Sequence, residues 1–356
     1  MSDSHLLLDL LFTYAASSRF RSDVKRWRIF ADMSVDIGIT LEVAATLFPR
    51  PFFLPCICLG NMFKALCGVA AGASGGSINL YWAKGSDISD INAKFGAQHT
   101  VTGAIGLVFA GLFAKSVSTV TPHILWLMYC FLTVLHLYAN VRCMRLISFD
   151  YVNTVRLDMI LREYIHADVK SQIISTPDEI AKKEPLWFRI FSLGQLFSRR
   201  KKEPSIHFGV AYDEFCQQSG KPIDDLRLEI MKAKSITGDD LQSSGAFETL
   251  NDRYIISSGM TNNSKPCVVV SFFSDVSPEQ QTKAYVHAQI LTNLIQERQQ
   301  KQGITKLDYE GQLGLEAEAQ SRLQSMWKEF LTSSARAGWD LSRSELRTRG
   351  YEVKVV

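Results

Sequence analysis

The sequence lacks the short motifs that mark the common nucleotide-binding and hydrolytic enzymes. It has no P-loop, no G-x-G-x-x-G after a strand-like segment, no H-E-x-x-H and no G-x-S-x-G. His207, Asp213 and Cys216 are close together in the sequence, and we interpret them as surface residues, because closeness in sequence does not make a catalytic cluster. We therefore expect a protein that is not an enzyme and that needs no cofactor.

Cysteine is scarce and irregularly spaced. The chain of 356 residues holds seven cysteines. Cys56-x-Cys58 is the closest pair, and by itself it is a weak metal-binding signal, so we expect buried thiols and no metal site. The N-terminus, MSDSH, lacks the basic region of a secretory signal.

Charge is scarce in the first half of the chain. The formal net charge is only +3, and the longest basic run is Arg199-Arg200-Lys201-Lys202, so we expect no nucleic-acid partner. Residues 29–141 are dominated by Ala, Gly, Leu, Val, Phe and Ile, whereas residues 150–356 hold most of the charge. The mean hydropathy of the chain is near zero, which is the value expected when an apolar part and a soluble part are averaged. We predict a mainly α protein, with a polytopic helical membrane domain followed by a small α+β domain.

Two apolar stretches carry stripes of small residues at four-residue spacing. In the stretch 56–82 the stripe is Gly68, Gly72 and Gly76, and in the stretch 97–114 it is Thr102, Gly106, Ala110 and Ala114. Such spacing places the small residues on one helical face. Each interior glycine costs a helix about 1 kcal/mol relative to alanine in water, whereas in a bilayer small residues let helices approach closely. We predict helix packing at Gly68, Gly72, Gly76, Gly106 and Ala110.

Four apolar segments of about 18 to 27 residues are each long enough, or nearly so, to cross a bilayer. They cover residues 29–48, 56–82, 97–114 and 124–141. If the chain crosses four times, one side receives Arg19, Arg21, Lys25, Arg26, Arg28, Lys84, Lys94, Arg142 and Arg145. The other receives Arg50 and Lys115, so the positive-inside rule predicts both ends inside. The competing interpretation is a soluble helical bundle, which Asp32, Asp36 and Glu42 favour.

Several polar residues interrupt the apolar half. Arg28, Asp32 and Asp36 repeat every four residues, and His136 and Asn140 share the same spacing. Lys64 lies one turn before Gly68, where it either belongs to a site or extends to the membrane interface. Polar side chains in lipid should turn inward, to pair or to line a wet cavity. The candidate ligand site is therefore Arg28, Asp32, Asp36, Lys64, His136 and Asn140.

The second half is divided by a proline-rich linker. We expect an amphipathic exit helix over residues 142–172, a linker over 173–204 and an α+β domain over 205–356. The linker carries Trp187, Phe188 and Phe191 before its basic run, which suits a membrane surface or an ordinary solvated linker equally well. In the last domain, Ser277-Pro278 predicts a helix start, and a second helix should run from about 315 to Ala337, ended by Gly338.

Four ordered motifs resemble those of the root UV-B sensitive (RUS) family. KRWRIFAD at 25–32, with Asp36 one turn on, resembles the K-x-W-R-x-x-A-D-x-x-x-D stretch. GVAAGA at 68–73 is similar to the glycine-rich helix, and SDINAKFGAQ at 89–98 to the A-D-x-x-A-K-x-G-x-Q segment. The sequence from His136 to Arg156 resembles the H-L-x-A-N-Y-x-A-V-R…L-N-x-x-R segment. The RUS-like core thus covers residues 25–156.

The resemblance implies an integral or membrane-associated protein with a helical domain before a smaller mixed domain, in an organelle left open among plastid, endoplasmic reticulum and other endomembranes. It implies links to UV-B response, vitamin B6 homeostasis and auxin transport, and it supplies no reaction. It also implies a further helical stretch before residue 25, of which this chain holds residues 5–20. Two functions stay open: a membrane protein that binds or moves a small polar ligand, and a membrane-tethered adaptor whose C-terminal domain binds a protein partner.

Overall fold

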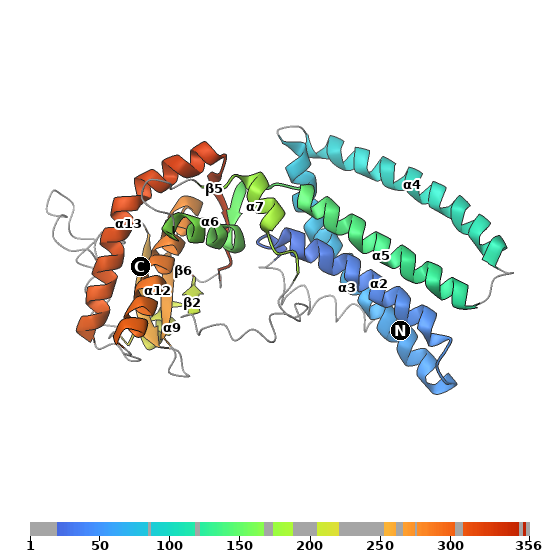
Figure 1. The fold of residues 1–356 in the computed structure, drawn as a ribbon, viewed down its shortest axis with the longest axis horizontal. Coiled ribbons are helices and arrows are strands. Elements are labelled where there is room, and N and C mark those ends of the chain that lie inside the picture. Colours follow the sequence, from blue (N-terminus) through green and yellow to red (C-terminus); the bar gives the residue numbers. More distant parts are fainter. Residues whose placement is uncertain are drawn as a thin grey trace. The chain divides into compact units, whose positions relative to one another are not determined.

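The computed structural model describes residues 20–84, 87–117, 122–166, 174–187, 205–220, 253–260, 266–274, 276–302, 309–348 and 352–353. The chain divides into two compact units (Figure 1). The first contains residues 1–149 and 181–193, and the second contains residues 150–180 and 194–356. The linker residues Phe188 and Phe191, the basic run at 199–202 and nearly all of the apolar run at 5–20 lie outside the described residues.

The described part of the first unit contains four long helices (Figure 1). They are α2 (Val24–Ala45), α3 (Arg50–Ala83), α4 (Ile88–Val117) and α5 (Pro122–Leu146). A short turn at Pro49 joins α2 to α3, and α2 then packs along α3 and also contacts α5, whereas α4 contacts α3. Trp27 and Ala31 of α2 pack with Ala70 of α3 in a small buried cluster.

Among the described residues, three helical segments are long and apolar enough to cross a membrane: Arg50–Ala83, Ile88–Lys115 and Ile124–Leu146. In the second and third of these segments, no residue of the most apolar stretch is buried against the rest of the described chain. The sequence predicted a fourth span over 29–48, but α2 is not among the candidates. Its three carboxylates, Asp32, Asp36 and Glu42, dilute its apolar character.

Two glycines outside the predicted stripes mark a close approach between α2 and α3. A Cβ on Gly38 would lie 2.8 Å from the Gly60 carbonyl oxygen, and a Cβ on Gly60 would lie 2.8 Å from that of Gly38. Only glycine therefore fits where α2 crosses α3. At Gly68, Gly72, Gly76 and Gly106, an added Cβ would meet nothing within 4 Å among the described atoms. The helix packing predicted for these positions thus has no counterpart within the described chain.

The second unit contains a mixed sheet. Its strands are β2 (Ser205–Phe208), β4 (Pro266–Phe273) and β3 (Tyr254–Met260), in that order. Strand β4 is central: β2 pairs parallel with it, β3 antiparallel, and β6 (Glu352–Val353) parallel. Val268, Val269 and Val270 of β4 are fully buried, because the strand is covered on both faces.

The second unit also contains two long helices that pack with this sheet and with each other. Helix α12 (Pro278–Gln302) contacts β2, β3 and β4 and packs against α13 (Tyr309–Ala337). The predicted cap of α12 is confirmed: the Gln280 amide donates to the Ser277 hydroxyl at 3.2 Å, and the Ser277 amide donates to the Gln280 side chain at 2.9 Å. The predicted end of α13 is also confirmed, since Gly338 has a φ of +95°.

The predicted exit helix over 142–172 is wrong in its middle. Helix α5 ends at Leu146, and the chain then forms β1 (Tyr151–Asn153) and a new helix, α6 (Thr154–His166). The strand exists because β5 (Asp340–Glu345), near the other end of the chain, pairs parallel with it. Asn153 starts α6 by accepting the Arg156 amide at 2.8 Å. The segment 150–180 accordingly belongs to the C-terminal unit, whereas the sequence placed residues up to 172 with the helices.

The remaining described helices are short. Helix α7 (Pro177–Lys183) begins in the second unit and ends in the first, and α9 (Tyr212–Ser219) packs on β3 and β4. At β3, Gly259 is required by close contact, since a Cβ there would lie 2.2 Å from the Gln218 carbonyl oxygen.

Candidate functional site

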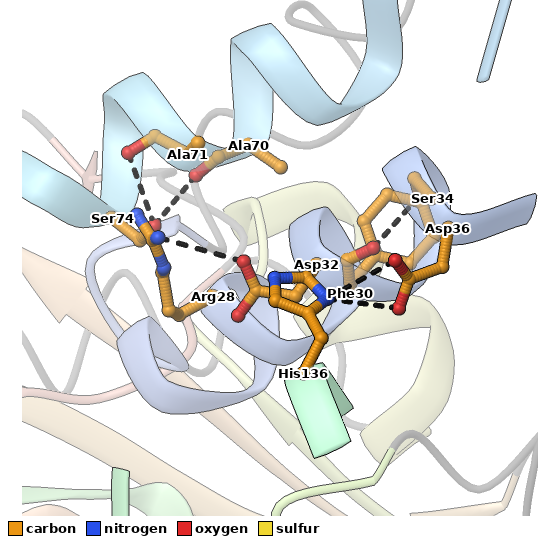
Figure 2. A network of polar contacts seen from close by, with 9 residues as sticks. All are labelled: Arg28, Phe30, Asp32, Ser34, Asp36, Ala70, Ala71, Ser74 and His136. Carbon is orange, nitrogen blue, oxygen red and sulfur yellow. Dashed lines mark hydrogen bonds and ion pairs between the residues drawn. The ribbon is translucent and has the colours of Figure 1, made fainter. Parts of the chain in front are cut away.

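The first half of α2 presents its acidic side chains inward. Asp32 is 5% exposed, and one of its carboxylate oxygens, Oδ1, lies 3.5 Å from an Arg28 guanidinium nitrogen (Figure 2). The other, Oδ2, has no hydrogen-bond partner among the described residues. Asp32 lies outside the three candidate spans, and burial raises the pKa of its carboxyl, while the Arg28 and His136 charges act in the opposite direction and Asp36 adds to the rise. A buried carboxylate with half its acceptors unused is the most unusual group in this unit.

Asp36 follows one turn later and meets α5. His136 Nδ1 lies 3.0 Å from Asp36 Oδ2 and 3.1 Å from Oδ1, so the imidazole faces both carboxylate oxygens (Figure 2). The Tyr129 hydroxyl donates to the Asp36 carbonyl at 3.2 Å and lies 2.7 Å from the Thr40 hydroxyl. Side chains of α5 therefore hold the fourth and fifth turns of α2 through polar contacts.

Helix α3 forms the apolar side of the site. Ser74 is buried, but its hydroxyl donates to the Ala70 carbonyl at 2.7 Å, and so it does not donate to Asp32 (Figure 2). The Ser34 hydroxyl likewise donates to the Phe30 carbonyl of its own helix at 2.7 Å. These local bonds leave the acidic cluster without hydroxyl donors from either residue.

The structure brings together four of the six predicted site residues: Arg28, Asp32, Asp36 and His136. Lys64 instead forms an ion pair with Glu42, two turns beyond Asp36 towards the end of α2. Asn140 is half-buried one turn beyond His136 and has no polar contact within the described chain. The candidate site is thus smaller than the sequence indicated.

The sequence does not predict the polar contacts that Glu42 and Tyr129 make along α2. It indicates Glu42 only as a residue that favours a soluble bundle, and Tyr129 only as part of an apolar run. Thr40 offered a signal, since it continues the four-residue spacing of Asp32 and Asp36.

Other motif residues serve the architecture. Lys25 is 2% exposed and pairs with Glu184 at 2.9 Å, and Trp27 packs edge-on against Phe20 with ring centroids 4.8 Å apart. Arg156 is buried and donates to the Tyr151 carbonyl at 3.1 Å, which ties α6 to β1. These contacts show that the motif residues support the fold as well as the site.

The second unit contains a buried polar pair and a half-buried polar network. The Tyr254 hydroxyl lies 3.2 Å from His287 Nδ1, and burial lowers the pKa of His287 to about 3, with the Lys283 charge acting in the same direction. Asp158 accepts from Tyr285 at 2.8 Å and from Gln289 at 2.6 Å at one end of a cleft of about 360 Å³ between α6 and α12. No group of three or more acidic, histidine or cysteine side chains suited to a metal occurs in the described ranges.

The two halves of the chain match two family descriptions. Residues 4–168 match the "Vitamin B6 photo-protection and homoeostasis domain", and residues 173–353 match "Root UVB sensitive protein, C-terminal". The chain belongs to the root UVB sensitive (RUS) family. The resemblance carried by the sequence motifs is therefore confirmed, and the polar site lies wholly within the first of these RUS domains.

Individual RUS relatives agree with this membership. The chain is 29% identical to Protein root UVB sensitive 3 of Arabidopsis thaliana over 295 residues, which cover 82% of this chain and 60% of the relative. It is 31% identical to RUS family member 1 of Dictyostelium discoideum over 52% of this chain and 34% of the relative. It is 32% identical to the chloroplastic Protein root UVB sensitive 2 of Arabidopsis thaliana over 48% of this chain and 38% of that protein. No solved structure matches the chain.

Proposed function

We propose that the helical unit of this RUS chain is a membrane-embedded module that binds a small polar ligand between α2 and α5 and catalyses no reaction. The observation that carries the proposal is Asp32, a buried carboxylate with an oxygen that no donor in the described chain satisfies. Keeping a charge in such surroundings is costly unless it binds something. Polar groups from two helices converge beside it, as they do in ligand sites between the helices of bundles.

The surroundings of the site support a membrane location. Helices α4 and α5 expose large apolar side chains that water would solvate poorly, among them Leu107, Phe109, Leu127 and Phe131. Extended apolar surfaces of this kind mark sites that a protein partner or a bilayer covers. Three helices of spanning length favour the lipid bilayer as the partner of this unit.

The family description points to the first ligands to test. The domain that contains the site is named for vitamin B6 homoeostasis, and B6 vitamers are small polar molecules. One relative is named chloroplastic, so a plastid membrane is one proposed location and other endomembranes remain alternatives.

The test is ligand binding to the full chain purified in detergent. We expect pyridoxine to raise its melting temperature and Asp32→Asn to abolish that rise while the variant stays folded. Glu318→Gln is the matched control, because it also neutralises one carboxylate in an ion pair, but on the exposed face of α13. Binding that survives Asp32→Asn unchanged, or no binding by the folded wild-type chain, would refute the ligand site.

The second candidate is a membrane-tethered adaptor whose C-terminal unit binds a protein partner. It is favoured by Trp187, which is 40% exposed in the segment 181–193 ahead of the C-terminal residues 194–356, since exposed aromatic side chains are common in protein interfaces. The two functions differ in complementation of a mutant that lacks a RUS protein. Rescue by the soluble residues 150–356 alone favours the adaptor, and loss of rescue by Asp32→Asn in the full chain favours the ligand site.

A further inference from the structure

The acidic cluster on α2 has more negative than positive charge. Arg28, Asp32 and Asp36 come from α2. From α5, His136 faces the Asp36 carboxylate, and the Tyr129 hydroxyl donates to the Asp36 carbonyl. From α3, Cys67 lies near them, while Lys64 is engaged with Glu42. Counted without the imidazole of His136, whose charge depends on the pH, two carboxylates and one guanidinium leave the cluster with one uncompensated negative charge.

The geometry assigns that charge to Asp32. Arg28 approaches only one of its oxygens, and its own side chain is 34% exposed. His136 does not serve the other oxygen: its Nδ1 faces the carboxylate of Asp36, and Asp32 Oδ2 has no hydrogen-bond partner among the described residues. An ionised oxygen left in this position has lost its water without gaining a donor. Binding one proton removes the charge and with it most of this cost.

The same face of α2 offers this proton a route between solvent and Asp32. The His136 side chain is 43% exposed, Asp36 is next to it, and Asp32 is one helical turn from Asp36 on α2. A histidine in contact with a carboxylate can pass a proton between solvent and a buried group near neutral pH. The three groups thus run in sequence from an exposed side chain to a buried one.

We infer that Asp32 holds one exchangeable proton, supplied through His136 and Asp36, and that the small polar ligand of this site competes with it. The proton itself stands on the geometry of the cluster, whereas the competition rests on the proposed ligand-binding function. A ligand that donates a hydrogen bond to Asp32 needs the ionised carboxylate. Ligand binding therefore releases a proton, and a proton gradient across a membrane would bias it.

The proton is tested without any ligand, by infrared difference spectra of the full chain between about pH 4 and about pH 8. We expect the carbonyl band of a protonated carboxyl that is lost on raising the pH, is missing in Asp32→Asn and persists in Glu318→Gln. Neutralising a charged neighbour of Asp32 should move the pH midpoint of this band, in a direction that depends on the sign of the charge removed. Arg28→Gln and His136→Gln should shift it to higher pH, and Asp36→Asn to lower pH, because their charges act on Asp32 with those signs.

These shifts separate a proton site from a structural role, since simple loss of folding would not give opposite signs. Variants are compared only where melting curves show that they fold. A spectrum with no Asp32-dependent band overturns the proton site, even if pyridoxine still binds. If none of the three neighbouring substitutions moves the pH midpoint of this band, the assignment of the proton to Asp32 within the cluster is overturned.

The competition is tested by calorimetric titration of the full chain with pyridoxine in two buffers of different ionisation enthalpy. We expect release of up to about one proton per ligand, and weaker binding as the pH falls, by up to about tenfold per pH unit once Asp32 is mostly protonated. Binding with no change in protonation overturns the competition and leaves the ligand site standing. Absence of binding by pyridoxine overturns the ligand site and the competition, while the infrared result still decides whether Asp32 holds a proton.

Discussion

Lys25 and Glu184 form a buried ion pair between the start of α2 and the segment that follows α7. Lys25 Nζ lies 2.9 Å from Glu184 Oε2, and the two side chains are 2% and 6% exposed. The Lys25 ammonium also lies 6.0 Å from the centroid of the Phe149 ring. Arg26 strengthens the same contact by donating to the Pro185 carbonyl at 2.9 Å. The segment after α7, which is distant in sequence, is thereby held against the first turn of α2, where the RUS motif begins.

Removing one partner of this pair should be strongly destabilising. We expect Lys25→Met or Glu184→Gln to lower the free energy of unfolding by about 3 to 5 kcal/mol, because each leaves the other side chain buried without its partner. The double variant Lys25→Met/Glu184→Leu should recover a large part of the loss. Thermal melts in detergent measure this, with Arg322→Gln of the exposed Arg322–Glu318 pair as the control, for which we expect less than about 1 kcal/mol.

The glycine crossing between α2 and α3 makes a second prediction. Gly38→Ala and Gly60→Ala should each cost about 1 to 3 kcal/mol, because the new methyl group meets a backbone carbonyl that cannot move aside without parting the helices. Gly72→Ala is the matched control on α3. It should be neutral or stabilise the helix by up to about 1 kcal/mol, since its surroundings are open among the described atoms.

Gly72→Leu tests the packing that the sequence predicted for the small-residue stripe. A single chain in detergent should tolerate it, because a Cβ added at Gly72 meets no described atom within 4 Å. If the variant instead lowers the melting temperature or the oligomeric mass on a sizing column, the stripe is covered by another chain.

Acid should destabilise the C-terminal unit through His287. Its pKa is about 3 in the folded unit and about 6.5 when unfolded, so the unfolded state takes up the proton first as the pH falls. The stability that neutral His287 contributes is complete above about pH 6.5 and declines below it, by up to about 1.4 kcal/mol per pH unit, until about pH 3. Hydrogen exchange of peptides from β3 and α12 at about pH 7 and about pH 5 measures this. The decline should be smaller in His287→Gln, and an equal decline in both chains would contradict the assignment.

The boundary of the C-terminal unit predicts which fragments fold. Residues 150–356 should form a stable protein, whereas residues 205–356 should not, because the shorter fragment lacks β1, the partner of β5, and the buried Val152, Leu157 and Leu161. Far-ultraviolet circular dichroism and limited proteolysis distinguish the two. A cooperative melt of the shorter fragment would show that the segment 150–180 is dispensable.

Local signals in the sequence were enough to predict much of this protein. Ser277 marks a helix start through its side-chain hydroxyl, and Gly338 marks a helix end through its positive φ. The apolar runs define α3, α4 and α5 by length and composition. Asp32 was expected to turn inward because a carboxylate facing lipid is costly, and it is buried. The RUS motifs likewise identified the family, since a motif is a property of the chain itself.

Only the tertiary structure decided which distant groups meet. Lys64 pairs with Glu42 and not with Asp32 or Asp36, because the Gly38–Gly60 contact sets the register of α2 against α3. Strand β1 forms in place of the middle of a predicted helix because β5 supplies its hydrogen-bond partners from the far end of the chain. Periodicity shows which face a residue occupies, whereas the partner across that face depends on how far one element slides along another, and close packing determines this only in the folded chain.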